Sequence, residues 1–249
     1  KDKKVTYAQR MDAGYYLLGG YVNSTRQDSL LIIAQEMLAH GKQHKDPKWT
    51  ADALYWIARY HYAQGNIQDA IRAIHEALLQ PGLKDCEVTY WYYDQLGTDY
   101  YNLNQMDSAV YYYKKALASG KKHGAKTKDL EFVFNNLASA YAFQGKYLDA
   151  IDLYTEVINT AGLEYQCYAH IALGHIFKTL GLHAEAIANY GQADVIAKKF
   201  NNNEVRLRNY GAQLKVSTNL AEAKQLIQKG LALSASFQSN RSTTSLLLF

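Results

Sequence analysis

The sequence is poor in proline and cysteine and has no long hydrophobic run. Two prolines in 249 residues favour helices joined by short turns, because strand-and-turn architectures usually contain more proline. Cys86 and Cys167 are too few for a disulfide scaffold and do not indicate a redox compartment. No apolar run approaches the roughly 18 residues that a membrane-spanning helix needs, so we expect no membrane span in this chain.

The charge balance is mild, with a formal net charge of +4 and 20% charged residues. This charge is too small to indicate nucleic acid, and it is compatible with a neutral or acidic partner. Two lysine-rich segments, residues 41–48 and 120–128, join predicted helical hairpins. We interpret their lysines as solvated loop residues rather than phosphate contacts, because no aromatic residues are interleaved with them. We therefore expect no contact with nucleic acid.

A pair of small residues twelve positions apart recurs along the chain. An acidic residue usually precedes the second member, and an aliphatic residue often follows it. The pairs are Leu17–Ser29, which is degenerate, then Ala58–Ala70, Gly97–Ala109, Ala138–Ala150, Gly174–Ala186 and Gly211–Ala223. The second members lie at 29, 70, 109, 150, 186 and 223, so the period is 36 to 41 residues. Internal repetition with this period is typical of solenoid proteins.

Each copy has the pattern of two helices. In the fourth copy Phe134, Leu137, Ala138 and Tyr141 share one helix face, and Gly145 then ends the helix. Glycine or asparagine occupies the same breaking position in copies two, three and five, at Gly65, Asn104 and Gly181. The small residues allow the two antiparallel helices to approach closely. A single hairpin cannot bury its outer apolar face, so the hairpins are predicted to stack.

These residues resemble the tetratricopeptide repeat family. The segments FVFNNLASAYAFQGKYLDAIDLYTEVI (132–158) and HIALGHIFKTLGLHAEAIANYGQA (170–193) are similar to the family pattern, although the family period is usually 34 residues. The resemblance implies an all-α, right-handed superhelical solenoid of about six antiparallel helix hairpins over the whole chain. The predicted repeats lie near 10–43, 51–84, 90–123, 131–164, 167–200 and 204–237. Residues 238–249 are predicted to be either the start of a further hairpin or a truncated end.

The resemblance also implies that the first helix of each hairpin lines a concave groove that binds a protein or peptide segment. Repeat positions two, five, nine and twelve are the exposed ones there. The predicted groove residues are Tyr21, Tyr55, Arg59, Tyr62, Trp91, Asp94, Tyr101, Phe132, Asn135, Tyr168, His175 and Lys178, with Arg208 and Lys215 at equivalent places. The N-terminal half of this set is aromatic and the C-terminal half is more cationic. The alternative is that many of these rings pack against the neighbouring hairpin.

More specialised binding sites do not fit the sequence. Some members of the family bind chaperone tails with a clamp of lysine, asparagine and arginine from consecutive repeats. Near Asn135 and Asn136 the required cations are missing, so such a clamp is not expected. The segment 120–127 contains Lys126 and Thr127 but lacks the spacing of a phosphate-binding loop and a preceding strand.

Catalytic and metal sites are also not predicted. His40 and His44 are four residues apart, but no third ligand accompanies them. Neither cysteine has a histidine and an acid at a motif spacing, and Cys167 is most simply a packing residue. We therefore predict that the protein is not an enzyme and requires no cofactor or metal.

The sequence thus predicts a non-catalytic scaffold that binds a protein or peptide. Tyrosine-rich repeats with this long spacing resemble the N-terminal sensory regions of some bacterial two-component or transcriptional regulators, so we expect an interaction or sensing region of a larger bacterial regulatory protein. The alternative is a stand-alone periplasmic or cytoplasmic assembly scaffold, and an enzyme that uses the groove is a third, less favoured interpretation. The apolar residues 246–249 permit self-association through the last hairpin.

Overall fold

The computed structural model describes residues 11, 27–83, 86–217 and 219–235, and these residues form helices and turns without any strand. The predicted all-α fold of stacked helical hairpins is therefore confirmed. The chain divides into two compact units, residues 1–125 and 126–249, and each unit is described separately. Among the helices of the described residues, none is long and apolar enough to cross a membrane.

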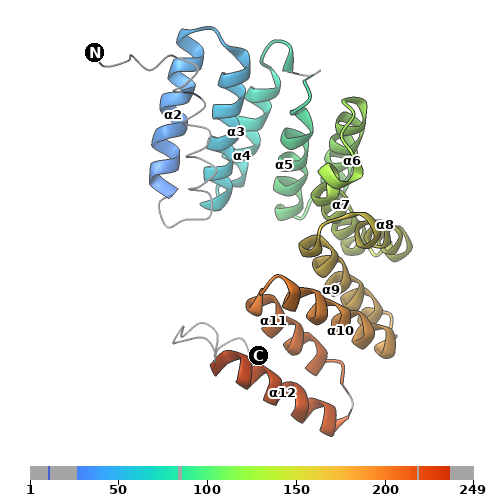
Figure 1. Ribbon diagram of the computed structural model, residues 1–249. Helices are drawn as coiled ribbons and strands as arrows, with labels where there is room; N and C mark the ends of the chain where they lie inside the picture. The colour runs from blue at the N-terminus through green and yellow to red at the C-terminus, as the bar shows by residue number, and fades with distance from the viewer. Residues whose placement is uncertain (1–10, 12–26, 84–85, 218, 236–249) are drawn as a thin grey trace. The chain divides into compact units, whose positions relative to one another are not determined.

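Among its described residues from 27 onward, the first unit contains two complete hairpins preceded by the helix α2 (Figure 1). Helix α2 (Gln27–Gln43) packs against the hairpin of α3 (Pro47–Ala63) and α4 (Ile67–Leu78). Helix α4 in turn contacts α5 (Thr89–Asn102), which forms the second hairpin with α6 (Met106–Lys122). Each hairpin buries the outer apolar face of the one before it.

The second unit contains three hairpins preceded by the short 3-10 helix η2 (Thr127–Leu130). The hairpins are α7 (Glu131–Phe143) with α8 (Tyr147–Thr160), α9 (Leu163–Thr179) with α10 (His183–Lys199), and α11 (Asn203–Leu214) with α12 (Leu220–Ala235) (Figure 1). Helix α8 contacts α9, and α10 contacts α11. The Arg206 guanidinium donates a hydrogen bond from Nε to Asp194 Oδ1 at 2.9 Å, which ties α11 to α10.

The turns inside the hairpins adopt the left-handed backbone conformation. Gly65, Gly145 and Gly181 have φ values of 77°, 74° and 77°, and Asn104 has a φ of 60°. Glycine reaches this conformation without steric cost, and asparagine is the next most tolerant residue. The predicted role of these four positions in ending the first helix of each hairpin is confirmed.

In the four hairpins from α3 to α10 the small residues lie where the two helices cross, whereas Gly211 and Ala223 of the last predicted pair are only half-buried. Ala58, Ala70, Ala109, Ala138, Ala150 and Ala186 are all 0% exposed. Gly97 and Gly174 are buried as well, and a methyl group on either would overlap a tyrosine ring of the second helix, Tyr113 or Tyr190 respectively. In these two hairpins the missing side chain of the first helix therefore makes room for an aromatic ring of the second.

A tyrosine recurs four residues after the second small residue and spans the hairpin. The hydroxyl groups of Tyr113, Tyr154 and Tyr190 lie 3.3 Å from Thr98 Oγ1, 2.8 Å from Ser139 Oγ and 3.0 Å from His175 Nδ1, respectively. All three tyrosines are at most 2% exposed. Their partners occupy the ninth repeat position, which was predicted to face the groove. The hydrogen bond between the tyrosine hydroxyl and the first helix was not predicted from the sequence.

Some predicted features lie outside the described residues. Tyr21 and the first helix of the degenerate first copy are among them, and so are residues 246–249, on which the prediction of self-association rests. Met11, whose repeat position also faces the predicted groove, is described and is 1% exposed, so it is a core residue.

The contact between Gly174 and Tyr190 predicts opposite effects for two glycine substitutions in the second unit. Gly174→Ala places a methyl group inside the Tyr190 ring and should lower the free energy of unfolding by about 1–3 kcal/mol. Gly191→Ala on α10 meets nothing within 4 Å and should raise it by up to about 1 kcal/mol through helix propensity. Urea unfolding followed by circular dichroism measures both. Equal effects of the two substitutions would show that the crossing is not close.

Candidate binding site

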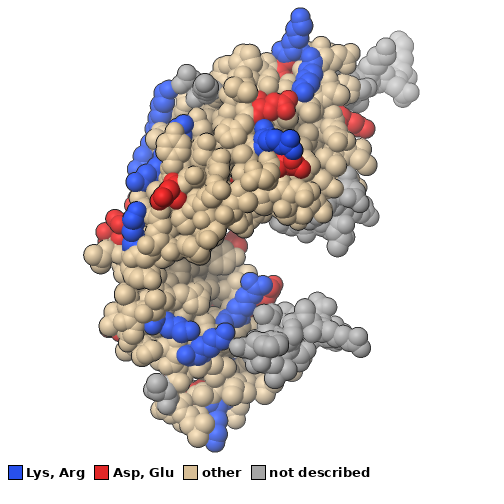
Figure 2. Space-filling model, turned by 180° about the vertical axis from the view of Figure 1, so that it is seen from behind, with Lys and Arg blue, Asp and Glu red and all other residues tan. Residues whose placement is uncertain are grey.

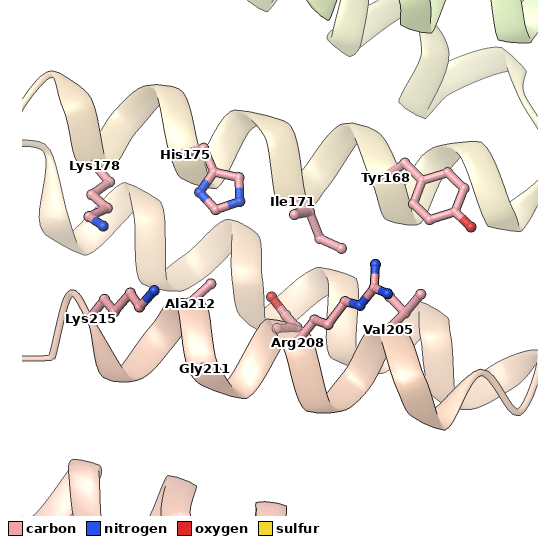
Figure 3. A pocket seen from close by; sticks show the side chains of 10 residues that line it. Tyr168, Ile171, His175, Lys178, Val205, Arg208, Gly211, Ala212 and Lys215 are labelled. Atoms are coloured by element: carbon pink, nitrogen blue, oxygen red, sulfur yellow. The ribbon is translucent and has the colours of Figure 1, made fainter. Parts of the chain in front are cut away.

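A cavity of about 480 Å³ lies between the first helices of two consecutive hairpins in the second unit, α9 and α11 (Figure 3). Its wall from α9 is formed by Tyr168, Ile171, His175 and Lys178, and its wall from α11 by Val205, Arg208, Asn209, Gly211, Ala212 and Lys215. The volume is within the range of about 300–1,000 Å³ that is typical of ligand pockets. Five residues that the sequence placed at groove positions meet here: Tyr168, His175, Lys178, Arg208 and Lys215.

The two walls use equivalent positions of two repeats. The four α9 residues Tyr168, Ile171, His175 and Lys178 correspond, 37 residues later, to Val205, Arg208, Ala212 and Lys215 on α11. These are repeat positions two, five, nine and twelve. Because spacings of three or four residues keep side chains on one helix face, each helix presents one continuous row to the cavity. Figure 3 shows the two rows facing each other.

The cavity is electropositive. Lys178 and Lys215 lie together at one end, and Arg208 extends between the two helices (Figure 3). Partial burial of the imidazole, together with the charges of Lys178 and Lys215, lowers the pKa of His175. Arg208 pairs with Glu204 at 2.6 Å, but both side chains are about 60% exposed, so the pair is weak and leaves the guanidinium available. Figure 2 also shows several Lys and Arg side chains on the α9–α12 part of this unit.

Two polar side chains complete the lining. Asn209 is 1% exposed, its Nδ2 donates to the backbone carbonyl of Tyr190, and its Oδ1 has no hydrogen-bond donor among the described residues. At the opposite end of the cavity the Tyr168 hydroxyl donates to Glu164 Oε1 at 2.9 Å. Burial and the Glu164 carboxylate raise the pKa of Tyr168 to about 12, so its hydroxyl remains a neutral donor.

The first unit has its own cavity of about 450 Å³ between the N-terminal parts of α3 and α5. Its lining residues are Lys48, Trp49, Asp52, Tyr55, Trp56, Val88, Trp91 and Tyr92. Tyr55 and Trp91 are predicted groove residues, whereas the other six were not predicted. Tyr55 also packs against the buried core, as the alternative interpretation of the aromatic residues expected.

The remaining predicted residues of the first unit lie further along α3 and α5. Tyr62 packs partly against the core, and its hydroxyl accepts a hydrogen bond from Asn102 Nδ2 at 3.2 Å. Tyr101 is partly buried, which raises its pKa. Arg59 and Asp94 both act electrostatically on the buried carboxylate of Asp99. These residues are neighbours, but they do not line the cavity of this unit.

The predicted groove residues of α7 stay apart from the α9–α11 cavity. Phe132 and Asn135 are partly exposed, and neither belongs to its lining. The backbone carbonyl of Asn135 accepts a hydrogen bond from Ser139 Oγ within the same helix. Of the predicted groove residues that the structure describes, the cavities thus gather seven: Tyr55 and Trp91 in one unit, and Tyr168, His175, Lys178, Arg208 and Lys215 in the other.

Several lining residues of the α9–α11 cavity were not predicted from the sequence, among them Ile171, Val205 and Ala212. The 37-residue offset between α9 and α11 was available as a signal for these positions. In the first unit all three tryptophans of the chain line one cavity, and only Trp91 among them was predicted to face the groove.

Sequence comparison finds repeats of one family. Profiles described as tetratricopeptide repeat match residues 85–162 and 168–199. No curated protein matches the chain.

Solved structures resemble the chain in fold. The quorum sensor NprR from B. thuringiensis, in its apo form, has a TM-score of 0.74 at 16% identity, covering 96% of this chain and 67% of that one. BtubC from P. vanneervenii has a TM-score of 0.70 at 16% identity, covering 87% and 95%. The Rap conjugation gene regulator of the plasmid pLS20, in complex with the Phr* peptide, has a TM-score of 0.60 at 16% identity, covering 96% and 71%.

The buried carboxylate of Asp99 predicts a pH-dependent stability. Asp99 is 0% exposed, Gln95 Nε2 donates to its Oδ1 at 2.8 Å, and its Oδ2 has no partner among the described residues. Burial raises its pKa from 3.8 to about 7, against the opposing effects of Gln95 and Arg59. The folded protein therefore keeps a proton that the unfolded chain releases above about pH 4, and this contribution to stability is lost as the pH rises to about 7.

Asp99→Asn should remove this dependence. The free energy of unfolding of Asp99→Asn minus that of the native chain should increase by about 2 kcal/mol as the pH rises from roughly 5 to 8. Urea unfolding at both pH values measures the difference, with Asp152→Asn on the exposed face of α8 as the matched control. If native and Asp99→Asn proteins change in parallel with pH, the carboxylate is ionised in the folded state throughout.

Proposed function

We propose that the protein is a non-catalytic module that binds an extended segment of another protein. The matches of residues 85–162 and 168–199 to tetratricopeptide repeat profiles are the premise of this proposal. The first helices of the hairpins provide the contacts. The observation that carries this proposal is the α9–α11 cavity, in which one helix row of one repeat faces the equivalent row of the next. Paired rows of this kind offer similar contacts at regular intervals, which suits an extended chain better than a compact ligand.

The charges of the cavity favour an acidic segment. Lys178, Arg208 and Lys215 supply three cationic groups, and the partners of Arg208 and Tyr168 are exposed carboxylates that a ligand can replace. Lysine and arginine groups at a partly enclosed site attract carboxylates more strongly than they do in open water. A glutamate or aspartate side chain, or a carboxyl terminus, fits this end of the cavity.

The uncharged lining favours apolar side chains beside the acidic group. Ile171, Val205 and Ala212 form an aliphatic surface between the cationic end and Tyr168. Burial of an aliphatic side chain there contributes about 25 cal/mol per Å² of apolar surface. The proposed ligand segment therefore contains at least one acidic and one aliphatic residue within a few positions of each other.

A second, finer proposal concerns the biological setting. We infer that the chain is the interaction or sensing region of a larger bacterial regulatory protein, and the likeness in fold to the quorum sensor NprR and to the Rap regulator solved with a Phr* peptide supports this inference. The alternative is an assembly scaffold without an output domain. The coding sequence on both sides of the chain tests the choice, because a regulator requires an adjoining kinase, phosphatase or DNA-binding domain.

Selection from a random peptide display library tests ligand binding. Peptides selected on the native chain should be enriched in Asp and Glu relative to the unselected library. Charge reversal by Lys178→Glu together with Lys215→Glu should weaken the selected peptides at least about tenfold, since two favourable charge pairs become repulsive. Fluorescence anisotropy of labelled peptides measures the dissociation constants.

The matched control reverses the same number of charges on another helix. Lys198→Glu with Lys199→Glu alters two exposed residues of α10 that lie outside the cavity, and it should change peptide affinity less than about threefold. Equal weakening by both double variants would indicate a general effect of net charge. Enrichment of peptides without acidic residues would contradict the proposed ligand chemistry.

A further inference from the structure

The cavity of the first unit is predominantly aromatic. Five of its eight lining residues are Trp or Tyr, and these include Trp49, Trp56 and Trp91, which are all the tryptophans in the chain. In an ordinary core such rings would be dispersed among aliphatic residues, yet Val88 is the only aliphatic member of this lining. The cavity therefore differs in chemistry from the α9–α11 cavity, whose charged groups are cationic.

Local sequence explains how the rings reach one place. The Asp46 side chain caps α3 by accepting a hydrogen bond from the backbone N–H of Trp49 at 3.1 Å, which fixes the first turn of the helix. Trp49, Asp52 and Trp56 then fall on one face of α3, because they are spaced three and four residues apart. From α5, Trp91 lies at the same repeat position as Asp52.

The walls of the cavity include buried, packed rings, and one ring at its rim is partly exposed. Trp56 and Tyr92 are 8% and 2% exposed, and the Tyr55 ring centroid lies 5.6 Å from the centroids of both, so these three rings are packed together. Trp91 is 41% exposed. A ligand that enters therefore meets preformed ring surfaces and one accessible indole, and little conformational entropy is lost in ordering the site.

A single carboxylate lies among the rings. Asp52 is partly buried, and its Oδ1 accepts a hydrogen bond from the Tyr92 hydroxyl at 2.7 Å. Burial raises the pKa of Asp52, while the Tyr92 bond and the charge of Lys48 oppose the rise and Asp46 adds to it. Lys48 is exposed, so its ammonium group can remain in water while a ligand occupies the aromatic interior.

We propose that this cavity binds an organic cation of the alkylammonium class, with a quaternary or methylated ammonium group enclosed by the tryptophan and tyrosine rings and balanced by Asp52. Aromatic faces attract cations, tryptophan most strongly, and methylated ammonium groups lose less hydration than primary ones when they are enclosed. The same chain shows this contact elsewhere in the first unit, where Lys115 Nζ lies 5.2 Å and 4.9 Å from the ring centroids of Tyr93 and Tyr111.

This site does not depend on the proposed peptide function. It lies in the other unit, it uses different residues, and its ligand carries the opposite charge. Two sources provide the same chemistry: a free choline-type amine, or a trimethylated lysine in another protein. Both place a quaternary ammonium at the rings, and they differ in what is attached to it.

Intrinsic fluorescence of the complete chain tests the proposal directly. Because all three tryptophans line the cavity, their emission reports on this site. Titration with choline or with acetyl-trimethyllysine amide should give a saturable change. The neutral isostere of choline, 3,3-dimethylbutan-1-ol, should give none, nor should sodium chloride at equal ionic strength. Choline and the lysine derivative are compared to distinguish the two sources.

Three variants, measured by calorimetry with the tighter of the two probes, assign the contacts. Trp91→Ala should weaken binding at least about tenfold, because it removes the accessible ring. Asp52→Asn keeps an acceptor for Tyr92 but removes the charge, and it should weaken binding several-fold. Lys48→Met removes the competing cation and should strengthen binding. Circular dichroism checks that each variant is folded. If Trp91→Ala does not fold, Asp52→Asn and Lys48→Met still test the proposal.

Several results would overturn the proposal. Equal affinity for choline and its neutral isostere would show an apolar pocket without preference for charge. No saturable change with either ammonium probe at millimolar concentration would show that the cavity binds neither. A shift of affinity in the same direction for Asp52→Asn and Lys48→Met would show that charge does not control binding.

Discussion

The close crossing of two helices within each of the four hairpins from α3 to α10 is the constraint on which the rest of the structure depends. The small residues at these four crossings are buried, and in two of the hairpins a glycine leaves room for a tyrosine ring of the second helix. That tyrosine reaches back to the first helix through its hydroxyl, at Thr98, Ser139 or His175. Helix α11 is held against α10 by the hydrogen bonds of Arg206 to Asp194 and of Asn209 to the Tyr190 carbonyl, so the equivalent positions of α9 and α11 face each other across the cavity.

Equivalent repeat positions contribute to two cavities that differ in chemistry. In the second unit the facing positions carry lysine, arginine and aliphatic residues, and in the first they carry tryptophan, tyrosine and one aspartate. Asp52 and Trp91 occupy the position that Tyr168 and Val205 occupy in the other cavity. The helix crossing does not fix the side chains at this position, because the crossing is formed by the buried small residues at other positions of the repeat. Recognition can therefore vary from hairpin to hairpin without any change in the fold.

Much of the fold could be predicted from the sequence, since its signals are local and repeated. The twelve-residue spacing of Ala138 and Ala150 and the break at Gly145 each depend on one hairpin alone. The bridging contact of Tyr154 with Ser139 could not be predicted, because hydrogen bonding depends on which rotamer the packed ring adopts. The groove residues were only partly predictable for a similar reason: an exposed repeat position such as Asn135 becomes part of a cavity only if the next hairpin presents a facing row.

The contact of His175 with Tyr190 joins the framework to the site. The Tyr190 hydroxyl, whose pKa burial raises to about 12, stays neutral and can either donate to the imidazole Nδ1 or accept from it. A carboxylate bound near Lys178 and Lys215 would favour the protonated imidazole, reversing the effect of the two lysines on its pKa. In a protonated imidazole Nδ1 would be the donor and the Tyr190 hydroxyl the acceptor, so the contact is compatible with both charge states. The cavity can therefore gain a positive charge on ligand binding while the helix crossing beneath it remains unchanged.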